Sequence, residues 1–314
     1  MTTGTMTTGA DGVALEVRRL GRRYGRKWAL RDATFRLPAG RVCGLVGPNG
    51  AGKTTLLEIA AGLRSASTGR AEILGHPAGS AEARARTAFL PQEKPLFRRF
   101  TVAETLRLGR ELNPGWDQRL AEDFVRAGGV SPTQRVGGLS GGQRTRLALA
   151  LALGKRPELV LLDEPLADLD PLARRETVAA LLGEVAERGI TVLLSSHLVA
   201  ELDTLCDHLL LLSRGGLRLA GDIDEIISVH RMLSAPLGGD TVPAGLTPHT
   251  VVETDRHGDR ITALVRPGGP VDPGWQSWSP TLEELVLAYL RQADPPPLIS
   301  PSAHVPGLAQ EVPA

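Results

Sequence analysis

The chain has 314 residues, of which 42% are hydrophobic, enough for one large packed domain and a smaller one. Its formal net charge of +1 gives no overall field that would gather nucleic acid or anionic lipid, so any such contact has to be local. Two cysteines, Cys43 and Cys206, are too few for a disulfide framework or a Cys₄ zinc site, which favours a reducing cytosol. No apolar run approaches the roughly 20 residues of a membrane-spanning helix, so a role at a membrane would require a separate spanning subunit.

The first half of the chain alternates strand-like and helix-like segments. Residues 1–12, "MTTGTMTTGADG", are polar and nearly repetitive, and we expect them to be disordered. From Val13 the runs "VALEVRRL", "ATFRL" and "RVCGLVG" predict strands, and a helical pattern follows Lys53. The later runs "LVLLD" and "TVLLSS" are continuously apolar, as in parallel strands covered on both faces. This alternation predicts an α/β core.

The rest of the chain predicts a helical insert and a small C-terminal unit. Between Gln92 and Gly138 two amphipathic pieces, "TVAETLRLGREL" and "DQRLAEDFVRAGG", indicate inserted helices. After Ile227 comes a linker-like stretch, "SAPLGGDTVPAGLTP", then a predicted hairpin turning at His257 and Gly258, and a capped helix in "SPTLEELVLAYLRQ". We expect an accessory domain over residues 231–292 and an unstructured proline-rich tail over residues 293–314.

The strongest chemical signal is "GPNGAGKTT", which lies between an apolar strand and a helix as a phosphate-binding P-loop does. The backbone N–H groups of its glycines can close around phosphates, Lys53 reaches the β- and γ-phosphates, and the Thr54 hydroxyl can coordinate Mg²⁺. The motif therefore predicts a nucleotide site formed by Gly47, Pro48, Asn49, Gly50, Ala51, Gly52, Lys53, Thr54 and Thr55.

Acidic and polar residues follow several of the predicted strands. Asp163 and Glu164 end "LVLLDEP", where a charge pair is costly without a cation or another partner. Asp163 is placed to hold Mg²⁺ through water and Glu164 to polarise an attacking water, although the pair alone could also cap the next turn. Gln92 in "FLPQE", His197 in "SSHL" and Tyr24 in "RRYGRKWAL" are each, taken singly, as compatible with a structural role.

A second glycine-rich helix start occurs in "GGLSGGQRTRLALALAL", residues 137–153. Its exposed N–H groups and helix dipole attract an anion. Because the P-loop already surrounds phosphates from one side, this helix start would have to offer its donors from an opposing face. The pattern raises the question of whose phosphate it binds.

The motifs, taken in order, resemble the ATPase subunit of ATP-binding-cassette (ABC) transporters over residues 13–230. The order is Tyr24, the P-loop, Gln92, "LSGGQ" at residues 139–143, "LLDEP", "ADLDP" at residues 167–171 and His197, and "LSGGQ" separates this family from other P-loop proteins. The resemblance implies a P-loop NTPase core with a parallel sheet, an antiparallel β-subdomain, a helical subdomain at about residues 93–150 and a small C-terminal α+β unit. It also implies that Tyr24 stacks on adenine, that Gln92 senses Mg²⁺ and the attacking water, and that His197 contacts the γ-phosphate.

Family members work as head-to-tail dimers in which the signature loop of one chain covers the ATP on the P-loop of the other. By that resemblance the partner's phosphate would be bound by Ser140, Gly141, Gly142 and Gln143, and Asp170 would lie across the dimer seam. One departure is visible in "ADLD", where the family usually has a serine and then a small residue. Ala167 removes a hydroxyl there, and Asp168 adds a charge.

The resemblance further implies partners. We expect a homodimer or a pair with another ABC ATPase, docked on separate transmembrane permease subunits at the inner face of the cell membrane, with no nucleic-acid partner. The segment "PLFRRFTVAETL", residues 95–106, is the candidate docking surface, and a solvated charged face is the alternative. The C-terminal unit ending "PTLEELVLAYL" is similar to that of ABC-2-type exporter ATPases, while its alternative is a lid that only packs on the core. An importer ATPase remains an alternative, because the cassette does not reveal the direction of transport. A non-transport ABC ATPase acting on ribosomes or DNA is the remaining class.

Overall fold

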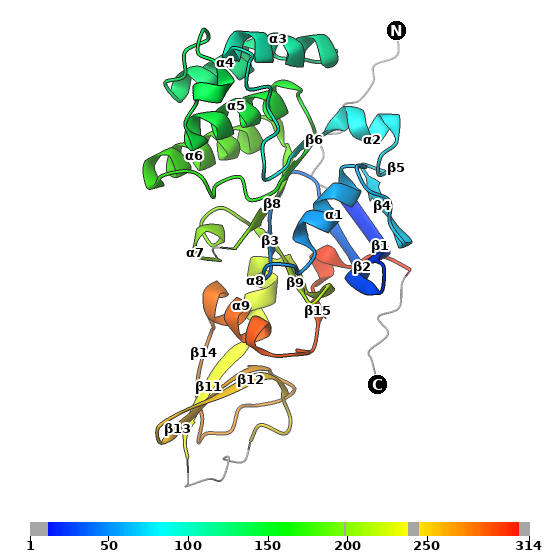
Figure 1. Ribbon diagram of the computed structural model, residues 1–314. Helices are drawn as coiled ribbons and strands as arrows, with labels where there is room; N and C mark the ends of the chain where they lie inside the picture. Colours follow the sequence, from blue (N-terminus) through cyan, green and yellow to red (C-terminus); the bar gives the residue numbers. More distant parts are fainter. Residues whose placement is uncertain (1–11, 198, 238–244, 308–314) are drawn as a thin grey trace, which may run out of the picture.

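A computed structural model describes residues 12–197, 199–237 and 245–307. Its centre is a seven-stranded sheet in the order β15-β10-β9-β3-β8-β7-β6 (Figure 1). Strands β3 and β6 to β9 run parallel, β10 is antiparallel to β9, and β15 is parallel to β10. The strands span β3 (Val42–Val46), β6 (Thr87–Leu90), β7 (Leu159–Leu162), β8 (Thr191–Ser196), β9 (His208–Ser213), β10 (Gly216–Asp222) and β15 (Leu298–Ile299).

The continuous apolar runs of the central strands are explained by cover on both faces of this sheet. In β7, Leu159 and Leu161 point into one hydrophobic cluster and Val160 and Leu162 into another. Since successive side chains of a strand point to opposite faces, each layer receives every second residue. The prediction of buried parallel strands at these two runs is confirmed, and Cys43 in β3 is buried as expected, which raises the pKa of its thiol.

One face of the sheet is covered by helix α1 (Lys53–Ala60) and an antiparallel sheet in the order β2-β1-β4-β5. Long apolar side chains of β1 and β2, among them Leu15 and Phe35, are fully buried in the cluster that also holds Leu56 of α1. This sheet is the antiparallel β-subdomain that the resemblance implied. Its strands are β1 (Val13–Tyr24), β2 (Lys27–Pro38), β4 (Thr68–Ile73) and β5 (His76–Pro77).

Helices group at one end of the central sheet, at the top of Figure 1. The two predicted amphipathic helices of the insert are present as α3 (Val102–Leu112) and α4 (Gln118–Ala127). Helix α3 begins with a capping box, because the Thr101 hydroxyl accepts from the Glu104 N–H and the Glu104 carboxylate accepts from the Thr101 N–H. The other helices are α2 (Ala81–Arg86), η1 (Val136–Gly138), α5 (Gly141–Gly154), α6 (Pro171–Arg188), α7 (Val199–Leu202) and α8 (Ile223–Ser228). No helix of the described ranges is long and apolar enough to cross a membrane.

The C-terminal unit is a four-stranded antiparallel sheet in the order β12-β13-β11-β14 with helix α9 (Leu282–Arg291). The predicted hairpin is confirmed: His257 pairs with Arg260, and Gly258 takes the left-handed φ of +59° that such a turn requires. The predicted linker is wrong at its start, because Ser234, Ala235 and Pro236 belong to strand β11, which pairs on both sides. The strands are β11 (Arg231–Pro236), β12 (Thr250–His257), β13 (Arg260–Arg266) and β14 (Gln276–Trp278).

Helix α9 joins this unit to the rest of the molecule. Its residues Leu285, Val286 and Tyr289 are fully buried in the same cluster as Leu202 of α7 and Ile226 of α8. The C-terminal sheet thus rests on a helix whose apolar face is part of the main core.

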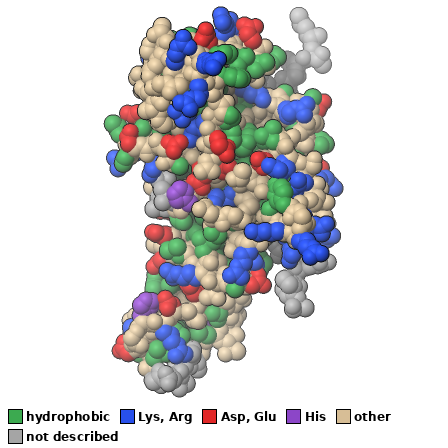
Figure 2. Space-filling model, in the orientation of Figure 1, with side chains coloured by type: hydrophobic (Ala, Val, Ile, Leu, Met, Phe, Trp, Pro, Cys, Tyr) green, Lys and Arg blue, Asp and Glu red, His purple; other side chains and the backbone are tan. Residues whose placement is uncertain are grey.

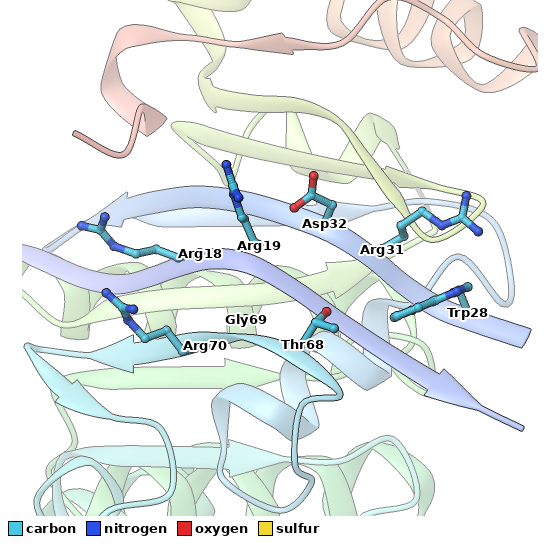
Figure 3. Close-up of a pocket in the computed structure, with 8 residues that line it drawn as sticks. All are labelled: Arg18, Arg19, Trp28, Arg31, Asp32, Thr68, Gly69 and Arg70. Carbon is cyan, nitrogen blue, oxygen red and sulfur yellow. The ribbon is translucent and has the colours of Figure 1, made fainter. Parts of the chain in front are cut away.

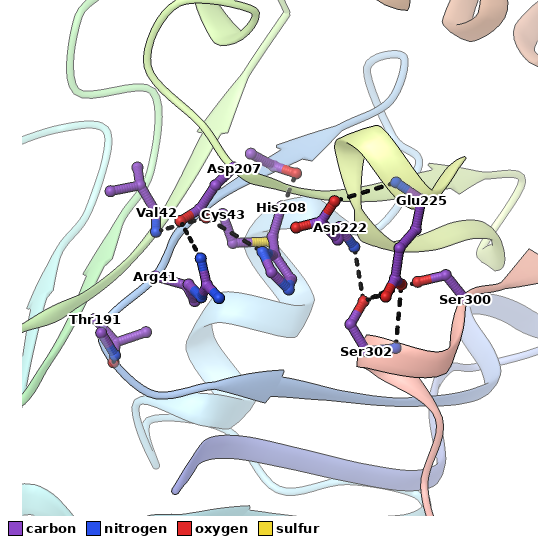
Figure 4. A network of polar contacts seen from close by, with 12 residues as sticks. Arg41, Val42, Cys43, Thr191, Asp207, His208, Asp222, Glu225, Ser300 and Ser302 are labelled. Carbon is purple, nitrogen blue, oxygen red and sulfur yellow. Dashed lines mark hydrogen bonds and ion pairs between the residues drawn. The ribbon is translucent and has the colours of Figure 1, made fainter. Parts of the chain in front are cut away.

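The proline-rich end is ordered up to residue 307, contrary to the disorder expected from its composition. Strand β15 adds to the edge of β10, and η2 (Pro301–Ala303) follows. The Ser302 hydroxyl donates to Glu225 (2.7 Å) and accepts from the Asp222 N–H (2.8 Å), as Figure 4 shows. A free sheet edge, these hydrogen bonds and the buried side chains of Ala303 and Val305 hold this segment. The remainder of the predicted tail, residues 308–314, and residues 1–11 lie outside the described residues.

Candidate nucleotide site

The P-loop connects β3 to α1 and is shaped by glycines. Gly47 and Gly52 have φ of +155° and +108°, and a Cβ atom at Gly47 would lie 2.3 Å from the Leu212 carbonyl oxygen. Larger residues are therefore excluded at this position. The Lys53 side chain is buried and its Nζ donates to the Gly47 carbonyl at 2.7 Å, which folds the lysine over the loop. The loop thus places a cation beside a ring of backbone N–H groups, as phosphate binding requires.

A cavity of about 760 Å³ opens beside this loop, within the range of small-molecule sites. It brings together segments far apart in the sequence: the end of β1, the P-loop, and the loops that follow β6, β7 and β8. Most of the residues predicted for the nucleotide site line it, together with three that the sequence did not single out as ligands, Lys27, Ala29 and Ala167. The lining residues are Tyr24, Lys27, Ala29, Asn49, Gly50, Ala51, Gly52, Lys53, Thr54, Thr55, Gln92, Asp163, Glu164, Ala167 and His197.

The carboxylate of Asp163 is held from two sides. It is 1% exposed and accepts from the Thr54 hydroxyl at 2.7 Å and from the Ser195 hydroxyl at 2.6 Å. The Thr54 and Asp163 oxygens are hard donors of the type that Mg²⁺ prefers when phosphates and waters complete its shell. These two residues therefore fit the predicted metal site.

Ser195 is a residue of the site that the sequence reading missed. It is fully buried, and besides donating to Asp163 it accepts from the Glu164 N–H at 2.8 Å. One hydroxyl thus positions both acidic residues that end β7. The available signal was a pair of serines closing an apolar strand, directly before His197.

Glu164 has the backbone conformation of a constrained residue. Its φ is +48°, which costs a non-glycine residue about 1–3 kcal/mol and persists only where the surroundings fix it. One carboxylate oxygen lies 3.8 Å from Lys53 Nζ, and the other is 2.7 Å from His197 Nδ1. Because a carboxylate only accepts, Nδ1 of His197 is the donor. The acid is aimed into the cavity between a lysine and a histidine.

Tyr24 lies at the rim of the cavity, at the end of β1. Its side chain is 41% exposed, and the guanidinium groups of Arg22 and Arg64 lie 4.8 and 5.4 Å from its ring centroid. The ring is therefore available to an aromatic ligand only in competition with cationic neighbours. Gln92 is exposed and lines the same cavity.

The residues of the LSGGQ signature motif lie outside the lining of this cavity. Ser140 caps α5 through a capping box, in which its hydroxyl accepts from the Gln143 N–H and the Gln143 side chain accepts from the Ser140 N–H. Asp170 likewise caps α6, accepting from two backbone N–H groups. Within the described part of the chain, Ser140, Gly141, Gly142, Gln143 and Asp170 are absent from the lining of the cavity. The two predicted phosphate-binding helix starts are thus separate in one chain.

A second cavity of similar size, about 750 Å³, lies on the antiparallel sheet, on the side of the molecule where Figure 2 shows many Lys and Arg side chains. Figure 3 shows four arginines in its lining, with Asp32 between Arg19 and Arg31. Arg18 and Arg70 are already paired with Glu16 and Glu72, at 2.5 and 2.9 Å. Since no P-loop residue lines this cavity, we assign the nucleotide to the other one.

Comparison with known proteins agrees with this site. Residues 30–167 match the family model described as ABC transporter. The chain is 39% identical over 210 residues to the aliphatic sulfonates import ATP-binding protein SsuB 2 of Pseudomonas aeruginosa (strain UCBPP-PA14), covering 66% of this chain and 75% of that one. It is 37% identical to the Nod factor export ATP-binding protein I of Rhizobium johnstonii, over 65% of this chain and 67% of that one.

Solved structures show the same fold. One described as the ATP binding subunit of an ABC transporter is 28% identical, with a TM-score of 0.62, and covers 68% of this chain and 92% of that one. CbiO1 of Clostridium perfringens, described as part of the ABC transporter complex cbiONQ, is 25% identical with a TM-score of 0.60, over 69% and 92% of the two chains. Fold and site therefore define a P-loop ATPase of the ATP-binding-cassette class. The chain belongs to the ABC transporter family, as the ATP-binding and ATP-hydrolysing subunit of a transporter complex.

Proposed function

We propose that the cavity beside the P-loop binds MgATP and that Glu164 is the general base of its hydrolysis. The support is the convergence of Lys53, Thr54, Asp163, Glu164 and His197 on one cavity. Lys53 and the P-loop N–H groups would bind the β- and γ-phosphates, and Thr54 and Asp163 would hold Mg²⁺. When bound, the metal neutralises charge on the phosphate oxygens.

Glu164 accepts the proton of the water that attacks the γ-phosphate. The donated hydrogen bond from His197 Nδ1 keeps the Glu164 carboxylate in one orientation, and a protonated ring would use Nε2 to donate to a γ-phosphate oxygen. Gln92 would lie close to the metal and the attacking water, and Tyr24 would stack on the adenine, displacing an arginine from its ring.

We propose that each site is completed by a second subunit. The observation that carries this is the position of the signature residues, which lie outside the lining of the chain's own cavity although they form a helix start that can bind an anion. The Ser140 hydroxyl accepts from its own helix, but its hydrogen can still be donated to a phosphate oxygen. In a head-to-tail dimer, Ser140, Gly141, Gly142 and Gln143 would face the partner's γ-phosphate, with Asp170 at the seam.

We propose that the subunit docks on separate permease subunits at the inner face of the cell membrane. Phe97 and Phe100, 60% and 36% exposed, stack on each other with ring centroids 5.1 Å apart in the segment that carries Arg98 and Arg99. An exposed aromatic pair flanked by cations is suited to a protein contact, and we assign it to the permease.

We propose an ABC-2-type exporter, in which residues 231–292 form the accessory domain. The support is the capped helix α9, preceded by a small antiparallel sheet, in place of a second cassette. Import is the second candidate, favoured by the identity with the sulfonate relative. Inverted vesicles containing the subunit with its permease would separate the two, because ATP outside such vesicles drives an exporter to accumulate substrate and an importer to lose it.

A disulfide tests the dimer, since its two Cα atoms have to lie within about 7 Å. Cys43 and Cys206 are replaced, and cysteines are placed at Ala51 in the P-loop and Leu139 beside the signature, in a Glu164→Gln background. Oxidation with ATP is expected to give covalent dimers on a non-reducing gel, and few without nucleotide. Cross-links confined to single chains would show that the signature closes on its own P-loop, and the dimer mechanism would be abandoned.

A further inference from the structure

A buried lysine lies two residues after Gln92. Lys94 is only 4% exposed, and its Nζ donates to Asp168 Oδ2 at 2.7 Å and to the Gln92 carbonyl at 3.4 Å. Removing an ammonium group from water costs several kcal/mol unless a charge and hydrogen bonds compensate. The lysine is therefore stable in this position only while Asp168 faces it.

Asp168 is the charge that departs from the usual family pattern, and it lies where three functional segments meet. It follows Glu164 by four residues, and its neighbour Ala167 lines the nucleotide cavity. A Cβ atom built on Gly141, the first residue of α5, would lie 3.3 Å from Asp168 Cβ. The aspartate thus lies close to the start of the signature helix and is paired with Lys94.

The Lys94 backbone is also held in a constrained conformation. Its φ is +48°, and the turn around it is closed by the Lys94 N–H donating to Pro91 and the Leu96 N–H donating to Lys94, at 3.1 and 2.8 Å. A lysine in this conformation, with its side chain buried, gives the loop after β6 one defined position. The loop that carries Gln92 is fixed through a side chain that does not itself line the cavity.

We propose that the ion pair between Lys94 and Asp168 is a positioning element that couples the Gln92 loop to the signature helix. A serine followed by a small residue could not form this pair, so the coupling is specific to chains with this lysine and aspartate. Neither side chain touches the reacting atoms; the pair acts through Gln92 and Gly141. The inference rests on the roles proposed above for Gln92 and the signature loop.

The consequence is kinetic. Neutralising either partner leaves Gln92 and the signature helix free to move independently, so the arrangement needed for hydrolysis forms less often. ATP binding by the P-loop does not depend on the pair. The expected kinetic effect is a lower kcat with an unchanged KM for ATP.

The test is a double-mutant cycle with Lys94→Met, Asp168→Asn and the double variant. We expect each single variant to lose about tenfold in kcat, with KM within about twofold, and the double variant to be no worse than the worse single variant. The control is Glu184→Gln, which breaks the largely buried pair between Arg188 and Glu184 inside α6 (2.8 Å) and should leave both constants unchanged.

A second measurement follows ATP-driven dimerisation by light scattering in a Glu164→Gln background. At saturating ATP the association constant of the dimer should fall about tenfold in Asp168→Asn, whose side chain is half exposed and whose substitution leaves the shape unchanged. Unchanged kcat and unchanged dimerisation in the single variants would overturn the proposal. So would losses that multiply in the double variant, because the two residues would then act separately. Failure of the proposed function has a different signature, namely ATP binding that survives Lys53→Ala.

Discussion

Replacing Ser195 by alanine tests whether a buried hydroxyl positions the two acidic residues of the site. The serine is fully buried, donates to Asp163 at 2.6 Å and accepts from the Glu164 N–H at 2.8 Å. Asp163 keeps its hydrogen bond from Thr54, so the substitution removes one of two contacts to that carboxylate. The Glu164 N–H, by contrast, loses the partner that holds it.

The size of the effect follows from these two contacts. A hydrogen bond to a charged group contributes about 1.5–3 kcal/mol, and an unpaired buried N–H costs about 1–3 kcal/mol. Partial relaxation around the small cavity reduces the sum, so we expect the free energy of unfolding to fall by about 3 kcal/mol. Because Glu164 has a constrained φ of +48°, the loss should also let its carboxylate turn away from the cavity. We expect kcat to fall by at least about tenfold, with little change in KM.

Denaturant unfolding gives the stability, and a coupled ATPase assay gives kcat and KM. The control is Thr177→Val, which removes another fully buried hydroxyl, one that donates to the Ala173 carbonyl within α6. It should cost stability without changing kcat. If Ser195→Ala loses stability as expected but hydrolyses ATP at the parent rate, the hydroxyl is structural and our account of Glu164 is wrong.

Three further outcomes are expected. Lys53→Ala removes the cation that faces the phosphates, so binding of a fluorescent ATP analogue should weaken at least about tenfold; parent-like affinity would exclude the P-loop assignment. Burial lowers the pKa of His230 from 6.5 to about 4, so the unfolded state binds more protons than the folded state between these two pH values. The size of the shift corresponds to about 3 kcal/mol of folding stability. This stability is fully present above pH 6.5 and is lost as the pH falls towards 4. The free energy of unfolding, measured at pH 7 and pH 4.5, should fall in the parent and much less in His230→Gln. Equal losses in the two proteins would contradict the assignment to His230. Reversing the charges of Arg98 and Arg99 should uncouple transport while the isolated subunit keeps its ATPase activity, and unchanged transport would remove this segment from the permease interface.

The motifs readable from sequence are those whose chemistry lies in one continuous stretch. The P-loop was predicted because its glycines, Lys53 and Thr54 are neighbours in the chain and act together through local backbone geometry. The parallel strands were predicted because a strand buried on both faces has to be apolar at every position, as β7 and β8 are. The hairpin at Gly258 was predicted for the same local reason, since a tight turn needs a residue that tolerates positive φ.

The sequence by itself therefore determined the family, the nucleotide loop and the alternation of strands and helices. Only the tertiary structure decided which polar residues are partners, because a hydrogen bond or ion pair depends on distance in space, and a single serine or lysine leaves no periodic signal. Ser195 meets Asp163 across 32 residues, and Lys94 meets Asp168 across 74. The ordered end of the chain has the same origin: β15 is only two residues long, too short to indicate a strand, and it is held because β10 presents a free edge at that point in the fold, where Ala303 and Val305 are also buried.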